Sequence, residues 1–121
     1  MPRPDDLLHR DVPFAVVDVE TTGTGTLQGD RITDIAIVQV LGGHVVEHFA
    51  SLVNPERRIP MHITRLTGID DAMVADAPVF RDVAPAIERA LQQRVFVAHN
   101  VAFDWGFVNG ELLRAQRDTL S

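Results

Sequence analysis

The sequence contains no cysteine and no long apolar run, and its eleven basic residues are all arginine. A chain without cysteine can form neither a disulfide framework nor a thiolate zinc site, which suits a cytoplasmic protein. No apolar stretch approaches the roughly 20 residues of a membrane-spanning helix. The opening segment, MPRPDDLLHRDVP, also lacks the apolar core of a signal peptide. We therefore expect a cytoplasmic protein that does not enter a membrane.

Positive charge is scarce as well. The formal net charge is −6 and the sequence pI is about 5.2. A broad phosphate-binding surface usually needs clustered basic residues, so this balance argues against one. It does not exclude an enzyme that holds only the end of a nucleic-acid strand, because bound metal ions can supply positive charge locally.

What the sequence does contain fits one small domain with a β-sheet. Its length of 121 residues and its hydrophobic content of 45% allow one core. Residues 14–19 are nearly all apolar, which predicts a central strand buried on both faces. Residues 31–41 and 44–53 are rich in β-branched residues and flank Gly42-Gly43, which predicts a β-hairpin.

Helices are expected after the hairpin. Residues 60–69 predict a short helix ended by Gly68. Residues 79–91 place their apolar side chains on one helical face. A short buried strand over 94–98 and a helix over 102–117 follow. This order, strand, hairpin, helices, strand and helix, predicts an α/β fold with a mixed sheet flanked by helices.

The segment FAVVDVETTG, residues 14–23, places two acids at the end of an apolar strand. Asp18 and Glu20 are two positions apart, so within a strand they share one face. Two neighbouring carboxylates repel each other, and a divalent cation such as Mg²⁺ relieves the repulsion by taking an oxygen from each. In the alternative interpretation the strand ends at Val17 and both acids are solvated.

A second acidic signal lies in VAHNVAFDWGF, residues 97–107. There a short strand leads into a helix, and Asp104 lies in the first turn of that helix. If this strand pairs parallel to the first one, Asp104 reaches the same end of the sheet as Asp18 and Glu20. The alternative is that the helix dipole alone favours an acid at this position.

Three segments resemble the motifs of one enzyme family. DVETTG at 18–23, LTGID at 66–70 and HNVAFD at 99–104 are similar to the first and second exonuclease motifs of the DnaQ-like, or DEDDh, 3′→5′ exonucleases. The similarity extends over nearly the whole chain. Within the family, the sequence is similar to the proofreading epsilon subunit of bacterial DNA polymerase III and to the exonuclease region of PolC-type polymerases.

The resemblance implies a ribonuclease H-like fold and removal of nucleotides from 3′ ends, in DNA replication or repair, with two Mg²⁺ or Mn²⁺ ions. It implies that Asp18 and Glu20 are metal ligands and that Asp104 binds the second metal, often through water. The expected partners are a single-stranded or frayed DNA 3′ end and a polymerase catalytic subunit. By the family's pattern, the substrate-binding residues are Thr21, Thr22, Gly23, Thr67, Asn100 and Phe103.

The family's third motif, His-x-x-x-x-Asp, has no counterpart downstream of Asp104. That motif supplies a general base and a fourth carboxylate. We therefore expect a flexible arm over residues 1–12, followed over 13–121 by the N-terminal two-thirds of one exonuclease domain, with a fold incomplete at the C-terminus. A missing segment should expose part of the apolar face between Phe103 and Leu113 and favour self-association.

Two alternatives stay open. His99 and Asp104 themselves have the spacing of the third motif. However, Ala-His-Asn-x-x-Phe-Asp is the wording of the second motif, so we interpret His99 as a structural residue at the strand end. The missing motif also allows a non-catalytic module that binds a nucleotide or a polymerase. As an enzyme, the 121-residue chain is expected to be almost inactive, because loss of a general base typically costs about 10²- to 10⁴-fold in rate.

Overall fold

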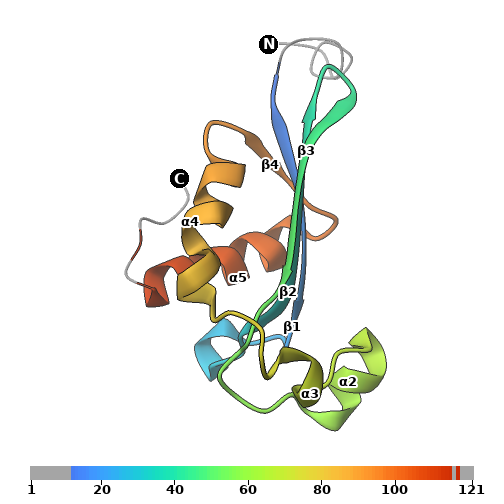
Figure 1. Cartoon of the computed structure of the whole chain (residues 1–121), viewed down its shortest axis with the longest axis vertical. Helices are drawn as coiled ribbons and strands as arrows, with labels where there is room; N and C mark the ends of the chain where they lie inside the picture. The colour runs from blue at the N-terminus through green and yellow to red at the C-terminus, as the bar shows by residue number, and fades with distance from the viewer. Residues whose placement is uncertain (1–11, 116, 118–121) are drawn as a thin grey trace.

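A four-stranded sheet forms the centre of the molecule (Figure 1). The computed structural model describes residues 12–115 and residue 117. The strand order is β3-β2-β1-β4, in which β1 (Phe14–Thr21), β2 (Ile32–Leu41) and β3 (His44–Leu52) are antiparallel neighbours. β4 (Val95–Val97) pairs parallel to β1. The predicted mixed sheet is therefore confirmed. Apart from residue 12, the predicted flexible arm lies outside the described residues.

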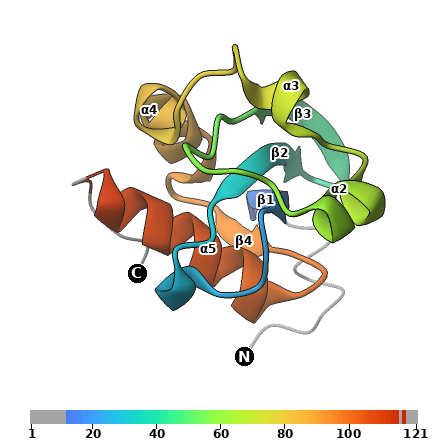
Figure 2. The same cartoon turned by 90° about the horizontal axis from the view of Figure 1, so that it is seen from below.

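Helices connect the strands. A 3₁₀ turn, η1 (Thr26–Gln28), follows β1. Three helices follow β3, namely α2 (Met61–Thr67), α3 (Asp71–Val74) and α4 (Phe80–Leu91). α5 (Val101–Arg114) follows β4. α4 and α5 lie on one side of the sheet, whereas α2 and α3 lie near one end of it (Figures 1 and 2). No helix in the described part of the chain is long and apolar enough to cross a membrane.

Local sequence explains where these elements begin and end. Gly42 and Gly43 have φ angles of 59° and 78°, so the hairpin turn uses the left-handed conformation that glycine adopts readily. Gly68 ends α2 in the same conformation, with φ 78°. The helix α3 was not predicted. It begins at Asp70, whose carboxylate accepts a hydrogen bond of 2.9 Å from the Met73 N–H.

The main core lies between α4, α5 and the side of the sheet that faces them, which we call the inner face. Alternate residues of each strand point to this side. Its fully or nearly buried side chains are Ala15, Val17, Val19, Ile32, Ile35, Ile37, Val53, Phe80, Ala84, Ile87, Ala90, Leu91, Phe107, Val108 and Leu112. The predicted apolar face of α4 is confirmed. Of the face between Phe103 and Leu113 that was expected to be partly exposed, Leu113 is 69% exposed, whereas Phe107 and Leu112 are buried.

The opposite side of the sheet, the outer face, is covered by no described helix over most of its length (Figure 1). Toward the hairpin turn, strand pairing places on this face the apolar residues Phe14, Val16, Val38, Val40, Val45, Val95 and Val97. Val16 is 39% exposed and Val95 49% exposed. The prediction that residues 14–19 are buried on both faces is therefore wrong. An apolar run shows that a strand can be covered, but it does not show that a second layer is present.

Two further details differ from the sequence-based expectations. The predicted buried strand over 94–98 forms as β4, but it is a partly exposed edge strand. A small second core, around Ile59, Ile69 and Val74, lies at the α2 and α3 end and includes the half-buried Leu52 of β3. Since Leu52 is paired with Asp34 across the sheet, this small core borders the outer face.

Candidate active site

Asp18 and Glu20 lie inside β1, which continues to Thr21. The alternative in which the strand ends at Val17 is therefore excluded. Both acids point to the outer face, since they alternate with the buried residues Val17 and Val19. Asp18 is exposed and Glu20 is half-buried. The two carboxylates thus stand side by side on the uncovered side of the sheet.

Asp104 reaches the same end of β1 from α5, as the parallel pairing of β4 predicts. The pairing of β1 with β4 stops at Val16 and Val97, so Val19 lies beyond the paired positions. The Val19 N–H donates a hydrogen bond of 3.1 Å to Asp104 Oδ2. Asp104 is only 6% exposed. Its carboxylate therefore fills the gap left by the end of β4 and ties α5 to β1.

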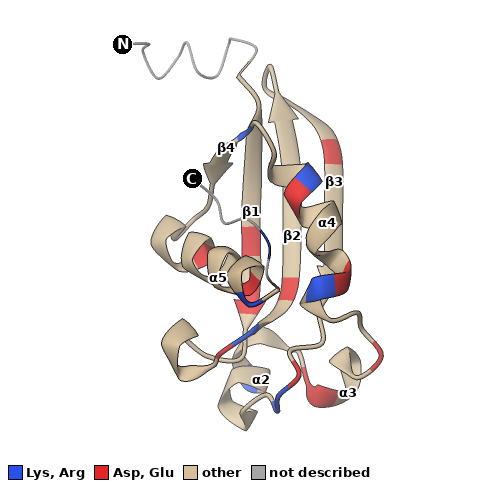
Figure 3. Cartoon of the chain, turned by 90° about the vertical axis from the view of Figure 1, so that its left-hand side faces the viewer, with Lys and Arg blue, Asp and Glu red and all other residues tan. Residues whose placement is uncertain are grey.

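A further carboxylate, that of Asp34, was missed by the sequence-based reasoning. In the β1–β2 pair, Asp34 lies directly opposite Glu20 on the outer face. Acidic segments of β1, β2 and α5 accordingly lie close together (Figure 3). The signal was present in RITDIAIV, where one acid interrupts an apolar strand. It could be placed only once the register of the hairpin against β1 was known.

The carboxylates at this end of the sheet repel one another. Burial raises the pKa of the Glu20 carboxyl, and the negative charges of Asp18, Asp34 and Asp104 raise it further. Burial and the charge of Asp18 raise the pKa of Asp34. Burial also raises the pKa of Asp104, although the hydrogen bond from Val19 opposes this shift. Among the described residues, no ion pair to an arginine compensates these acids.

This donor set suits a hard divalent cation. Oxygen ligands are those that Mg²⁺ and Mn²⁺ prefer, and an uncompensated group of acids attracts positive charge. The acidic side chains lie near one another, but their oxygens do not yet form a complete metal site. The described residues contain no group of three or more acidic, histidine or cysteine side chains arranged to hold a metal. Asp18 and Glu20 could hold a cation from the outer face. Asp104 would offer the carboxylate oxygen that Val19 does not use.

The segment after Glu20 is held by its own hydrogen bonds. The Thr21 hydroxyl donates to the Gly23 carbonyl. The Thr22 side chain is fully buried, and its hydroxyl donates to Asp30 Oδ1 at 2.8 Å and accepts from the Arg31 N–H at 3.1 Å. Both hydroxyls are thus committed within the protein. The predicted substrate contacts of Thr21 and Thr22 stay predictions, and each hydroxyl could take part in them only as a further acceptor.

Gly23 is needed for a close approach inside the protein. A Cβ atom at this position would lie 2.5 Å from Asp30 Oδ2. Asp30 in turn accepts hydrogen bonds from Thr22 and from the Gly25 N–H and lies 3.5 Å from Arg57. The glycine therefore allows Asp30 to organise the loop that follows the two acids.

The other predicted substrate residues lie around the same end of the sheet. Asn100 is exposed at the N-terminus of α5, and its carbonyl accepts from the Asp104 N–H at 3.0 Å. Phe103 is half-buried and packs against Phe107, with 4.8 Å between ring centroids. Asn100 and Phe103 are therefore brought next to Asp104. His99 is exposed just before α5.

Thr67 is less available than predicted. Its hydroxyl donates to the Ile63 carbonyl at 3.0 Å and accepts from the Ile69 N–H at 3.1 Å. These bonds complete the end of α2. The helix itself lies beyond the end of β1 (Figure 2).

Comparison with known proteins places these features in a family. The family model for exonucleases, RNase_T, matches residues 15–120. The chain belongs to this exonuclease family. It is 44% identical over 102 residues to the 3′-5′ exonuclease DinG of Bacillus subtilis (strain 168), and 37% identical over 107 residues to the PolC-type DNA polymerase III of Staphylococcus aureus. The alignments cover 84% and 88% of this chain but only 11% and 7% of those relatives.

The fold agrees with this membership. The structure of exonuclease X in complex with 5′ overhanging duplex DNA matches with a TM-score of 0.64 at 36% sequence identity. The match covers 75% of this exonuclease-family chain and 51% of exonuclease X. The resemblance to DnaQ-like exonucleases and the ribonuclease H-like fold class are therefore confirmed. Because the chain spans a small part of its curated relatives, their activities and substrates enter below only as proposals.

Proposed function

We propose that this chain carries the metal-binding half of a 3′→5′ exonuclease domain that removes nucleotides from DNA 3′ ends during replication or repair. One observation supports this above all others. In a chain of the exonuclease family, Asp18, Glu20 and Asp104 converge at one end of β1, and no ion pair among the described residues joins any of them to an arginine. The buried Glu111, by contrast, is paired with Arg31 at 2.8 Å.

The acidic residues would have different roles in metal binding according to their positions. Asp18 and Glu20 would hold Mg²⁺ or Mn²⁺ on the outer face, where both are accessible to a substrate. Asp104 would bind the second ion while its hydrogen bond to Val19 keeps α5 in place. Bound together, two such ions activate water and stabilise the attacking and leaving oxygens of a phosphodiester. Asn100, Phe103 and the backbone of residues 21–23 would receive the terminal nucleotide.

No general base is assigned among the described residues. His99 is exposed, and it belongs to the second motif and not to the third motif, which supplies the general base. We propose that residues 13–121 are the N-terminal two-thirds of the domain, since the match covers 51% of exonuclease X. Within a longer polypeptide, a polymerase catalytic subunit is the proposed partner, supported by the similarity to a PolC-type polymerase.

Digestion of a 5′-labelled single-stranded oligonucleotide with Mn²⁺ tests the activity. We expect slow shortening from the 3′ end, about 10²- to 10⁴-fold slower than with a complete family member, because a general base is lacking. Asp18→Asn should abolish the shortening, and a blocked 3′ end should prevent it. Shortening that survives Asp18→Asn, or that starts at the 5′ end, would overturn the proposal.

Metal binding gives an independent test. Calorimetric titration with Mn²⁺ should show that Asp18→Ala nearly abolishes binding, because this residue would bridge both ions. Asp104→Ala should weaken only one site. Equal losses in the two variants would contradict the assigned roles.

A non-catalytic binding module is the second candidate. It is favoured by the unassembled state of the acids and by the committed hydroxyls of Thr21 and Thr22. The two candidate functions differ in whether binding of an oligonucleotide depends on metal. A binding module should retain a fluorescent single-stranded oligonucleotide in the presence of a chelator and in the Asp18→Asn variant. The exonuclease domain should lose it in both.

A further inference from the structure

Asp34 has no role in the family's motifs, yet the pairing of β1 and β2 places it among the acids of the site. It lies directly opposite Glu20, while Asp18 is opposite Ala36, the next outer-face residue of β2. Side chains directly opposite one another in such a pair have Cβ atoms about 4.5–5.5 Å apart, and diagonal neighbours lie about 7–8 Å apart. Asp34 is therefore adjacent to Glu20 and diagonal to Asp18 on the same face.

The surroundings of Asp34 give it no basic counterpart. Its partner on the other side, in β3, is the apolar Leu52. Other acids near this end of the sheet are paired with arginine, as Asp30 is with Arg57 at 3.5 Å and Asp71 is with Arg58 at 3.9 Å. No described ion pair includes Asp34.

The repulsion between Asp34 and Glu20 lowers the stability of the fold unless a bound cation reduces it. Like charges directly opposite one another in a sheet are destabilising. A threonine or valine at position 34 would suit the strand better. The register also shifts immediately after Glu20, and such irregularities are over-represented next to active sites, where they re-aim side chains. The Ile35 backbone offers Asp34 one hydrogen bond, but no described ion pair offsets the repulsion from its neighbours. A local cost of this kind is typical of a functional position.

We propose that Asp34 is a further carboxylate of the cation site, a positioning residue that helps Glu20 hold a divalent ion on the outer face. This inference rests on the proposed metal-dependent function. Asp34 contributes negative charge and an oxygen from β2, so the site is built by two neighbouring strands and α5 and not by β1 and α5 alone. A carboxylate next to a metal ligand would help to orient Glu20 toward a divalent ion.

Mn²⁺ affinity, measured by electron paramagnetic resonance of the free ion, tests the proposal on the folded chain. Residues that support metal ligands typically contribute about 10- to 100-fold to affinity. Asp34→Asn should therefore weaken Mn²⁺ binding by about tenfold, and Asp34→Glu should restore most of it. Glu47→Gln is the matched control. It removes the same charge from an exposed position of β3 near the hairpin turn, opposite Gln39, and should leave the affinity unchanged.

A thermal unfolding measurement without metal separates this role from a structural one. Asp34→Asn should raise the melting temperature in chelator, because it removes repulsion, whereas a structural residue would lower it. A lowered melting temperature, or an unchanged Mn²⁺ affinity while Asp18→Asn abolishes binding, would overturn the role of Asp34 alone. If neither variant alters Mn²⁺ binding, the metal site of the proposed function fails as well.

Discussion

At the scale of single residues, the loop after β1 depends on how closely Asp30 approaches the backbone. Its carboxylate receives the Thr22 hydroxyl and the Gly25 N–H and lies against the space that a side chain at position 23 would fill. The glycine of the DVETTG segment thus serves the protein's own packing. The motif shows that a small residue is needed here without showing which neighbour requires it, and the role of Gly23 in substrate binding stays a prediction.

Gly23→Ala tests this contact. The added Cβ would meet Asp30 Oδ2 at 2.5 Å, so the carboxylate must move and its hydrogen bonds must weaken. We expect the free energy of unfolding to fall by about 1–3 kcal/mol, as for other overpacked sites. Gly106→Ala is the control, because nothing lies within 4 Å of its Cβ and it lies within a helix. Urea denaturation should show a gain of about 0.5–1 kcal/mol for that variant.

The raised pKa of Glu20 has a defined consequence for the metal-free protein. Because burial and the neighbouring acids raise its pKa above the ordinary 4.5, the folded state takes up a proton more readily than the unfolded state. The stability that the protonated Glu20 carboxyl gives to the folded state is therefore fully present below pH 4.5. It is lost as the pH rises through the raised pKa and the carboxyl becomes charged. Glu20→Gln should melt at a higher temperature than the parent at neutral pH, and the difference should shrink on acidification.

Glu88 provides a control of opposite sign. Its hydrogen bonds with Arg117 lower its pKa, so this group stabilises the fold above the ordinary value and loses that effect as pH falls through the lowered pKa. Glu88→Gln should therefore melt at or below the temperature of the parent at neutral pH. Melting curves recorded in chelator between pH 4 and pH 8 compare the two variants. A Glu20→Gln curve that lies below the parent at neutral pH contradicts the repulsion described above.

At the scale of elements, α5 is fixed to the sheet near both ends. Near its N-terminus, Asp104 accepts from Val19. Near its C-terminus, Glu111 accepts from the Arg31 side chain at 2.8 Å and from the Ile32 N–H at 3.0 Å. Between them, Trp105 packs edge-on against Phe96 of β4, with centroids 5.1 Å apart. These contacts keep the N-terminal turn of α5, and with it Asp104, at the end of β1.

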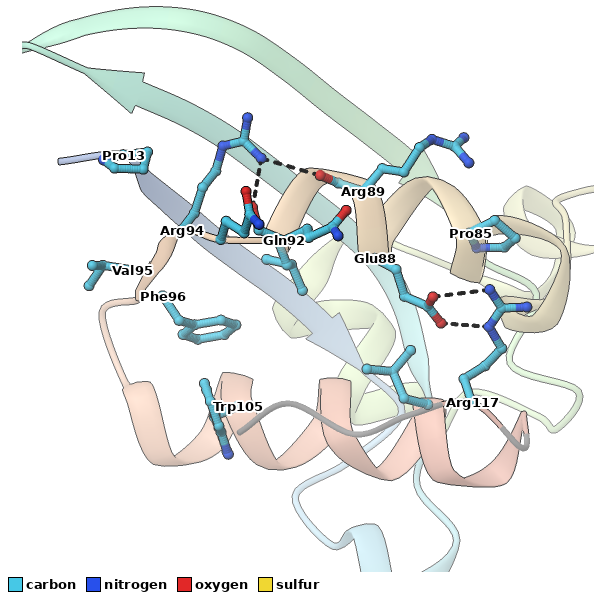
Figure 4. Close-up of a pocket in the computed structure, with 13 residues that line it drawn as sticks. Pro13, Pro85, Glu88, Arg89, Gln92, Arg94, Val95, Phe96, Trp105 and Arg117 are labelled. Atoms are coloured by element: carbon cyan, nitrogen blue, oxygen red, sulfur yellow. Dashed lines mark hydrogen bonds and ion pairs between the residues drawn. The ribbon is translucent and has the colours of Figure 1, made fainter. Parts of the chain in front are cut away.

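A cavity beside these contacts is lined by both polar and apolar groups. It has a volume of about 910 Å³ and lies between α4, β4 and α5, with Trp105 and Phe96 on one side and Glu88 paired to Arg117 on the other (Figure 4). It lies on the inner-face side of β4, because α4 packs on that face. It is therefore separate from the carboxylates, which point to the outer face.

Glu111→Gln tests the second attachment of α5. The Glu111 side chain is 3% exposed and that of Arg31 is 14% exposed, so the substitution leaves a largely buried arginine without its nearest partner. Breaking a buried ion pair from one side typically costs about 3–5 kcal/mol. We expect the free energy of unfolding to fall by about 3 kcal/mol, the lower end, because Glu56 lies 3.9 Å from Arg31 and can compensate in part.

The double variant completes this test. Replacing Arg31 by methionine as well should recover part of the loss, since no unpaired charge then remains in the interior. Chemical denaturation of the parent, both single variants and the double variant gives the coupling energy. Additive losses would show that the two side chains act independently and that the attachment of α5 does not depend on their pairing.

Which elements the sequence could predict follows from how local their signals are. The hairpin around Gly42-Gly43, the apolar face of α4 and the end of α2 at Gly68 depend on residues close in sequence, and all three were predicted. The position of Asp34 depends on the pairing of two strands, and that of Asp104 on the parallel pairing of β4. The position of Asp104 was predicted from the order of the elements. The position of Asp34 required the residue-by-residue register of β1 against β2.

At the scale of the whole molecule, the sheet has two unlike sides. The inner face is sealed by α4 and α5. The outer face carries the acids at one end and, toward the hairpin turn, apolar residues on all four strands that no described helix covers. An apolar run such as FAVV is compatible with either one or two covering layers, so sequence alone could not show this asymmetry. The sequence predicts an exposed apolar surface on α5, where Leu113 is exposed but Phe107 and Leu112 are buried.

Self-association of the 121-residue chain should therefore occur through the outer face. Contiguous exposed apolar surface on a monomer favours burial against another surface, and four neighbouring strands offer more of it than any single exposed side chain. Val16→Lys places a charge at the middle of this surface, where Val16 is 39% exposed and paired with Val38 and Val97. Sedimentation velocity should show a concentration-dependent increase in mass for the parent and a monomer for Val16→Lys.

Leu113→Lys is the control, because Leu113 is 69% exposed on α5, on the surface for which the sequence predicts exposure. It should associate like the parent. If Leu113→Lys is the variant that becomes monomeric, association uses α5 and the outer face has no part in it.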